Sequence, residues 1–292
     1  MKFSVARSIV QAKVARNLQV LDWLAQRYDI EKPIRLTKHE AFHLGKARSV
    51  VNLRTVEGRV ALRYWQAYAS VIPECFDFHG RMTSHRNNAS DPVNLALNYA
   101  YGVLEGECRA AINTIGLEPS VGFLHEPSSY QTKQSLVYDL QEPYRWLVDH
   151  VVLRMVLSRA FSWDDFYFTG DDYRLRIKPP LLDRYADLLR EQFNFGVMYR
   201  GKRLPWDTLI LRKCQELARY LLGETARFDL RSPKPVLERS DTRVLREKIL
   251  RLSSSDAQTL RLGKSTVHYL KRRAREKKLF RVYAPVLARL RE

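Results

Sequence analysis

The chain has 292 residues, 45% of them hydrophobic, which is enough for one sizeable helical core and a smaller appended unit. Fifty Lys and Arg residues against 32 Asp and Glu residues give a formal net charge of +18, so we expect a polyanionic partner. Neither a run of about 18 apolar residues nor a signal peptide occurs, which favours nucleic acid over a membrane. Three cysteines, Cys75, Cys108 and Cys214, lie far apart in no metal-binding spacing, so we expect reduced thiols in an intracellular compartment.

Hydrophobic residues recur at helical spacing through the first part of the chain. Residues 4–27 predict an amphipathic helix, with Ser4 as its N-cap. A second long helix is expected to begin near Thr55. A third should follow Asp91-Pro92 and end at Gly116, which suits a C-cap, and a loop continues to about residue 132.

The next part is again mainly helical. Residues 135–161 follow a helical period, and Pro143 should kink or restart that helix. Apolar segments around a Gly-Asp-Asp turn predict a β-hairpin over 166–177. Helices over 180–192 and 205–222 complete a mainly α fold with one small β-hairpin.

A change in composition divides the chain. Residues 229–239 contain two prolines and little apolar content, which predicts a linker. It would join a helical domain at 1–228 to a smaller domain at 240–292, which carries +10 of the total charge of +18.

The basic tail has the pattern of a helix-turn-helix. Short helices are expected over 244–252, 255–262 and 266–277, with Ser265 capping the third. That third helix pairs an apolar face with basic residues, so it could enter a DNA major groove. The alternative is a solvated basic helix packed on the main domain. The residues expected to contact DNA are Lys264, Ser265, Thr266, His268, Lys271, Arg272 and Arg275.

Candidate catalytic groups are dispersed along the helical domain. Glu57 lies on a helix beside apolar residues, and His125 ends an apolar run. Taken alone, such a Glu is usually a capping residue, and such a His is usually a core or hinge residue. Asp139 and Glu142 are three residues apart on an apolar helix, so they project from nearly one face.

Burying these paired carboxylates is costly, and a metal ion would offset the cost. Two carboxylates and an imidazole suit Mg²⁺ or Mn²⁺, which prefer oxygen ligands and accept phosphate oxygens. Spacing by itself does not establish that Glu57, His125 and Glu142 converge.

Four linked segments stand out, which are EGRVALRYW at 57–65, DPVNLALNYAYGVLE at 91–105, GLEPSVGFLH at 116–125 and SLVYDLQEPYR at 135–145. Together they resemble a known family, the CRISPR-associated integrase Cas1. The motifs YRGK and LARYLLG, which begin at Tyr199 and Leu217, continue the match. The resemblance extends over about residues 4–228 in the family's order.

The resemblance implies a metal-dependent endonuclease and integrase that joins DNA 3′-hydroxyl ends to a target by transesterification. The metal ligands of the family correspond to Glu57, His125 and Glu142 here. Asp139 is implied as an accompanying catalytic residue, and Mg²⁺ or Mn²⁺ as the cofactor. Double-stranded DNA, as donor ends and as target, is the implied partner. Residues that could position DNA are Arg59, Arg63, Tyr138 and Arg145.

Two features depart from the family's usual pattern. Members usually begin with a β-rich domain that supports the dimer and engages a small partner nuclease, whereas this chain starts at the helical part. The basic helix-turn-helix is unusual for CRISPR adaptation enzymes and is similar to casposases, the related transposon integrases. A CRISPR enzyme truncated at its N-terminus would share the first feature.

The resulting hypothesis is a casposase-like integrase, expected in the prokaryotic cytoplasm at the nucleoid, oligomeric on DNA and without membrane contact. A partner nuclease is doubtful on this hypothesis. One alternative is a CRISPR adaptation integrase that inserts spacers with that partner. An alternative of another class is a non-catalytic helix-turn-helix DNA-binding protein, although such a protein would have no reason to keep three costly polar groups.

Overall fold

A computed structural model describes residues 1–81, 89–125, 134–170, 172–233, 249–259 and 262–275. The mainly α fold class is confirmed. The long helices of the main domain are α1 (Lys2–Leu24), α2 (Glu31–Phe42), α3 (Val50–Ala69), α4 (Pro92–Ile115), α6 (Arg145–Leu157), α7 (Pro179–Asn194) and α8 (Trp206–Leu221). Shorter helices are η1 (His43–Lys46), η2 (Glu74–Phe76), α5 (Ser135–Gln141), η3 (Glu142–Tyr144) and η4 (Trp163–Asp165).

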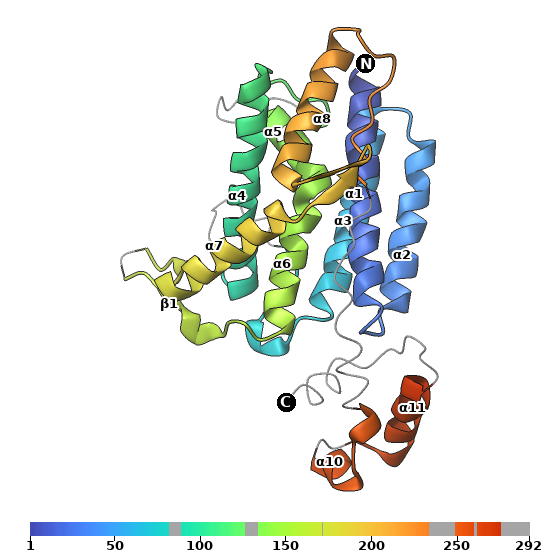
Figure 1. Cartoon of the computed structure of the whole chain (residues 1–292), viewed down its shortest axis with the longest axis vertical. Coiled ribbons are helices and arrows are strands. Elements are labelled where there is room, and N and C mark those ends of the chain that lie inside the picture. The colour runs from blue at the N-terminus through green and yellow to red at the C-terminus, as the bar shows by residue number, and fades with distance from the viewer. Residues whose placement is uncertain (82–88, 126–133, 171, 234–248, 260–261, 276–292) are drawn as a thin grey trace.

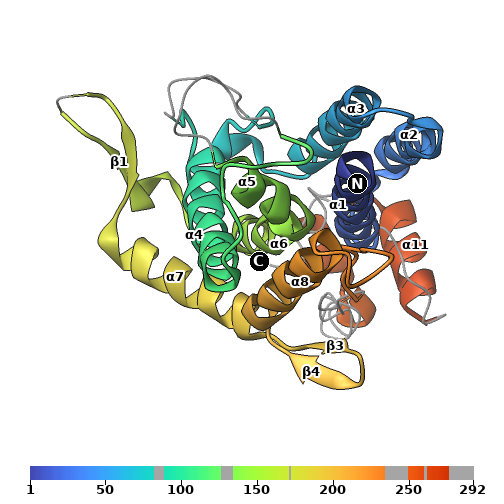
Figure 2. The ribbon, with the colours of Figure 1, turned by 90° about the horizontal axis from the view of Figure 1, so that it is seen from above.

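The helix α6 forms the centre of the main domain. It is buried on almost all sides, with Trp146, Leu147 and Val152 almost completely buried, as expected for a helix enclosed by others. It packs on α1, α4 and α7. Seen from above, α4 and α1 lie on opposite sides of it, and α2 and α3 lie beyond α1 (Figure 2). The site residues are therefore carried by helices that share one core (Figure 1).

Capping residues set the ends of α3 and α4. Asp91 accepts a hydrogen bond from the Asn94 backbone N–H, and Gly116 ends α4 with a φ of 76°, as the sequence predicts. The start near Thr55 was wrong, because Ser49 caps α3 and the helix begins at Val50. The predicted cap at Ser4 was also wrong, since α1 already begins at Lys2.

Pro143 interrupts the helix predicted over 135–161. The chain passes from α5 through the 3₁₀ turn η3 into α6, because proline lacks the backbone N–H that would continue the α-helical pattern. Glu142 is the first residue of that turn. The break therefore fixes the direction of one predicted ligand.

Two β-hairpins occur among the described residues of the main domain, where one was expected. The predicted hairpin pairs β1 (Phe166–Phe168) with β2 (Leu175–Ile177). A second pairs β3 (Val197–Tyr199) with β4 (Lys202–Leu204). Arg200 and Gly201 join its strands with φ values of 49° and 79°, the left-handed conformations that a tight two-residue hairpin turn requires.

The first residues of the predicted linker lie against α1. Leu230 is buried, and its backbone N–H donates to Ser8 Oγ at 2.7 Å. Arg16 donates to the carbonyl oxygens of Ser232 and Pro233. The remaining linker residues, 234–239, lie outside the described residues.

Two helices of the tail are described, α10 (Ser254–Thr259) and α11 (Lys264–Arg275). Ile249, Leu252, Leu270 and Ala274 form a small buried set within it. The predicted cap at Ser265 was wrong, because α11 begins one residue earlier. Of the helix predicted over 244–252, residues 244–248 lie outside the described part, as do 276 and 277 of the third.

Within the described residues, none of the helices combines the length and the apolar character needed to cross a membrane.

Candidate functional site

One lysine brings the two predicted glutamate ligands together. Lys13, on α1, contacts Glu57 Oε1 from α3, and its Nζ lies 2.5 Å from Glu142 Oε2 in η3. Because a single ammonium contacts both side chains, the two carboxylates meet at one place although 85 positions separate them in the numbering. The site therefore joins α1, α3 and the proline break after α5.

Glu142 is held ionised in the interior. Its side chain is 5% exposed, and burial alone would raise its pKa, but Arg145, Lys13 and His125 outweigh burial and bring the pKa down to about 2. Arg145 Nε lies 3.4 Å from Glu142 Oε1. The site thus keeps a buried negative charge that only cations compensate.

Asp139 fixes the loop that carries His125. Its Oδ2 accepts from the Leu124 backbone N–H at 2.9 Å, and its Oδ1 accepts from the His125 backbone N–H at 2.9 Å. The Nδ1 of the His125 ring lies 2.7 Å from Oδ1. With Nδ1–H donating to the carboxylate, the lone pair of Nε2 is left for a ligand, as in the carboxylate–histidine pairs of metal sites.

Two further residues hold this loop against α3 and α5. Arg54, on α3, donates to the Leu124 carbonyl oxygen at 2.6 Å. A Cβ at Gly122 would lie 2.3 Å from the His125 carbonyl oxygen and 2.6 Å from Ser135 Cβ. Only glycine fits such a close approach, so the position of His125 depends on it.

The side chains of the site are chemically suited to bind a divalent cation. Two carboxylates and one imidazole nitrogen are a donor set for Mg²⁺ or Mn²⁺. Oε2 of Glu142 is buried and accepts no regular hydrogen bond from the described residues, although the Lys13 ammonium is close. An ion would therefore compete with Lys13 for these carboxylates.

The predicted trio is not fully gathered for a metal in this structure. Among the described residues, the group whose three ligand atoms all lie within 4.8 Å of one another is His39, Glu40 and His43. Glu57 and Glu142 are brought together by Lys13, and His125 is close enough to lower the pKa of Glu142.

The predicted DNA-positioning residues of the main domain lie on α3, α5 and α6. Arg59 is half exposed and pairs with Glu40, at 3.2 Å between Nε and Oε2. Arg63 donates to Gln66 at 3.1 Å. The ring of Tyr138 meets that of His125 edge to face at 6.4 Å, and the Arg145 guanidinium stacks 4.8 Å from the Tyr101 ring.

The predicted DNA-contacting residues of the tail lie on α11. Lys264, Ser265, His268, Arg272 and Arg275 are exposed, and Thr266 is partly buried. Lys271 is also partly buried, and its Nζ donates to the Leu252 carbonyl oxygen at 2.7 Å, so it supports the packing of the tail.

Three residues of the site, Lys13, Arg54 and Gly122, were not predicted from the sequence. Lys13 had a detectable signal, because it follows Val5 and Ile9 at four-residue spacing and thus lies on the apolar face of its helix. A lysine there needs a buried partner. Arg54 and Gly122 carry no such signal, since their partners come from distant segments.

A family model described as CRISPR associated protein Cas1 matches residues 1–186 of the chain. The chain belongs to the Cas1 family. Among Cas1 relatives, it is 33% identical over 231 residues to the protein named CRISPR-associated endonuclease Cas1 3 of Thermus thermophilus, with 78% of this chain and 66% of the relative covered. The chain thus spans about two thirds of the length of that relative.

Solved Cas1-type structures share the fold. A structure titled "Casposase bound to integration product" matches with a TM-score of 0.72 and 35% identity, covering 86% of this chain and 69% of the casposase chain. A chain of a Cas6-RT-Cas1–Cas2 complex matches with a TM-score of 0.69 at 21% identity, covering 80% of this chain and 25% of its own length. The second match bears on the fold alone.

Proposed function

We propose that this chain is a divalent-metal-dependent DNA integrase of the casposase kind. It would join DNA 3′-hydroxyl ends to a target duplex by transesterification. The observation that carries the proposal is the meeting of Glu57 and Glu142 at Lys13, with His125 held beside them by Asp139. The 35% identity to a casposase whose structure contains an integration product supports this kind of reaction.

Glu57, Glu142 and Nε2 of His125 would hold Mg²⁺ or Mn²⁺, which when bound polarises a phosphate and lowers the pKa of an attacking hydroxyl. Asp139 orients the His125 ring and fixes which nitrogen faces the site. Lys13 and Arg145 place two positive charges beside the carboxylates, where they can attract a phosphate and balance charge that develops on it. Most of the rate would come from positioning and charge neutralisation.

The tail would supply a second DNA contact. Its helix α11 presents Lys264, Arg272 and Arg275 on an exposed side, while Leu270 and Ala274 anchor the opposite side. Such a helix suits phosphates or guanine edges in the major groove. The tail would therefore track or select target DNA, and the enzyme would act as a dimer or higher oligomer on it.

A CRISPR adaptation integrase is the second candidate. The Thermus relative is named a CRISPR-associated endonuclease. Strand transfer that requires an added small partner nuclease would identify this role. Transfer by the purified chain alone favours the casposase-like role.

The test is a strand-transfer assay with a short duplex bearing free 3′ ends, a supercoiled plasmid and Mn²⁺. We expect Glu57→Ala, His125→Ala and Glu142→Ala each to abolish joined products while DNA binding is largely retained. Glu191→Ala, at an exposed position of α7, is the control that should keep activity. Full transfer by any of the three site variants would overturn the site assignment.

A further inference from the structure

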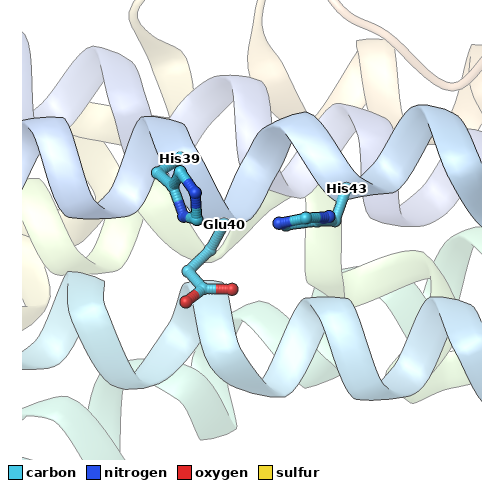
Figure 3. A group of neighbouring side chains, drawn as sticks. All are labelled: His39, Glu40 and His43. Atoms are coloured by element: carbon cyan, nitrogen blue, oxygen red, sulfur yellow. The ribbon is translucent and has the colours of Figure 1, made fainter.

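The end of α2 and the start of η1 carry a second cluster of metal-binding side chains. His39 and Glu40 lie near the end of α2, and His43 is the first residue of η1. One ligand atom from each lies within 4.8 Å of the other two. Figure 3 shows the Glu40 carboxylate directed toward the neighbouring helix. The His43 ring points back toward the Glu40 side chain.

The spacing of these residues is chemically specific. Residues four apart on a helix lie on one face, so the imidazoles of His39 and His43 are neighbours, with ring centroids 5.3 Å apart. The order His39-Glu40-Ala-Phe-His43 is the H-E-x-x-H pattern, whose two histidines bind zinc and whose glutamate is a general base. Here the distances among the ligand atoms place Glu40 in the ligand set as well. Ligand atoms that each lie about 2 Å from a shared ion are at most about 4 Å apart, so these side chains would have to move slightly closer together to bind one.

The cluster is partly exposed to solvent, so a metal ion in solution can reach it. His39 is exposed, and Glu40 and His43 are partly buried. The Glu40 carboxylate already pairs with a cation, since Arg59 Nε lies 3.2 Å from its Oε2. A metal ion would take the place that the guanidinium now holds beside this carboxylate.

We propose that His39, Glu40 and His43 form a site for a divalent transition-metal ion of the Zn²⁺ class. Two imidazoles with one carboxylate favour Zn²⁺ over Mg²⁺, whereas the oxygen-rich set at Glu57 and Glu142 favours Mg²⁺ or Mn²⁺. The two sites share no ligand. Arg59, which pairs with Glu40, lies two residues after Glu57 on α3.

The experiment measures Zn²⁺ binding to the tag-free full-length protein by calorimetry, with excess Mg²⁺ present to occupy the oxygen-rich site. We expect the variant carrying both His39→Ala and His43→Ala to lose about 100-fold or more in Zn²⁺ affinity, because both imidazoles are gone. His79→Ala is the matched control and should bind Zn²⁺ as the wild type does. His79 is an exposed histidine paired with Asp77.

A second variant tests the competition with Arg59. Arg59→Gln removes the cation that pairs with Glu40, so Zn²⁺ affinity should rise several-fold. Equal unfolding midpoints in metal-free buffer check that the double variant is folded. If the wild type binds no Zn²⁺ in excess Mg²⁺, or if the double variant binds it unchanged, the site is refuted, and neither result bears on strand transfer.

Discussion

Lys13 is the residue on which the candidate site depends most directly. It is 11% exposed on its side chain, and its pKa is raised because Glu142 and Glu57 outweigh the effect of burial. The ammonium therefore stays charged and substitutes for a divalent ion between the carboxylates. Removing one partner of a buried ion pair leaves an uncompensated charge.

Lys13→Met should lower the free energy of unfolding in EDTA by about 3 kcal/mol, because Glu142 is left buried without its ammonium. Mn²⁺ should recover more stability in this variant than in the wild type, since the ion no longer competes with the lysine. Urea unfolding with and without Mn²⁺ measures both effects. An identical Mn²⁺ effect in the two proteins would argue against an ion at Glu57 and Glu142.

Asp139 acts as a positioning residue in this geometry. Asp139→Asn keeps the size of the side chain but weakens its hold on His125, so Mn²⁺ affinity should fall about 10-fold to 100-fold. Strand transfer should recover substantially at saturating Mn²⁺, which a simple loss of folding would not permit. Glu118→Gln, in the same loop but exposed, is the control and should leave Mn²⁺ binding unchanged.

At the scale of helices, Asp149 ties α3, α4 and α6 together. Tyr64 donates to its Oδ2 at 2.8 Å, Tyr101 donates to its Oδ1, and Tyr68 donates to its backbone carbonyl at 3.1 Å. Burial raises the Asp149 pKa from 3.8 to about 6, against the lowering effects of Tyr101, Tyr64, Arg145 and Arg81. The network ties α3, which carries Glu57, to α4 and α6.

This raised pKa predicts a pH dependence of stability. The folded state binds the Asp149 proton more tightly than the unfolded state, so its stabilising contribution is complete below about pH 4 and is lost as the pH rises to about 6. Relative to Asp149→Asn, the wild type should lose a few kcal/mol of unfolding free energy across this pH window. Urea unfolding of both proteins at several pH values measures the difference, and a constant difference would contradict the assignment.

At the scale of the whole molecule, the charge is unevenly distributed. Residues 240–292 contribute +10 of the +18, and α11 presents Lys264 and Arg275 to solvent. Each phosphate contact releases counterions, so binding through this helix should depend steeply on salt.

Lys264→Gln with Arg275→Gln should weaken DNA binding and reduce the salt slope by about 2, one for each lost phosphate contact. The control carries Arg190→Gln and Arg219→Gln, which make the same change in net charge. Those two guanidiniums already pair with Asp187 and Glu224. DNA-binding titrations over a range of salt give the slopes, and equal slopes in the two variants would count against α11 as a DNA contact.

The sequence by itself determined the features that depend on neighbouring residues, such as helices and their ends. The period of apolar residues predicted α4, α7 and α8, and Asp91 and Gly116 predicted both ends of α4, because caps act within one turn. Pro143 predicted the break before α6 because its effect is covalent. The helix start at Ser49 and the turn at Arg200-Gly201 were missed, although both rest on local chemistry.

The tertiary structure decided which distant residues lie together. No spacing rule relates Glu57, His125 and Glu142, and only the packing of α1 against α3 and η3 places Lys13 between the two glutamates. The need for glycine at position 122 arises from atoms of His125 and Ser135, which only the folded chain brings near. Local propensity acts over a few residues, whereas a site built from distant segments depends on how the core packs.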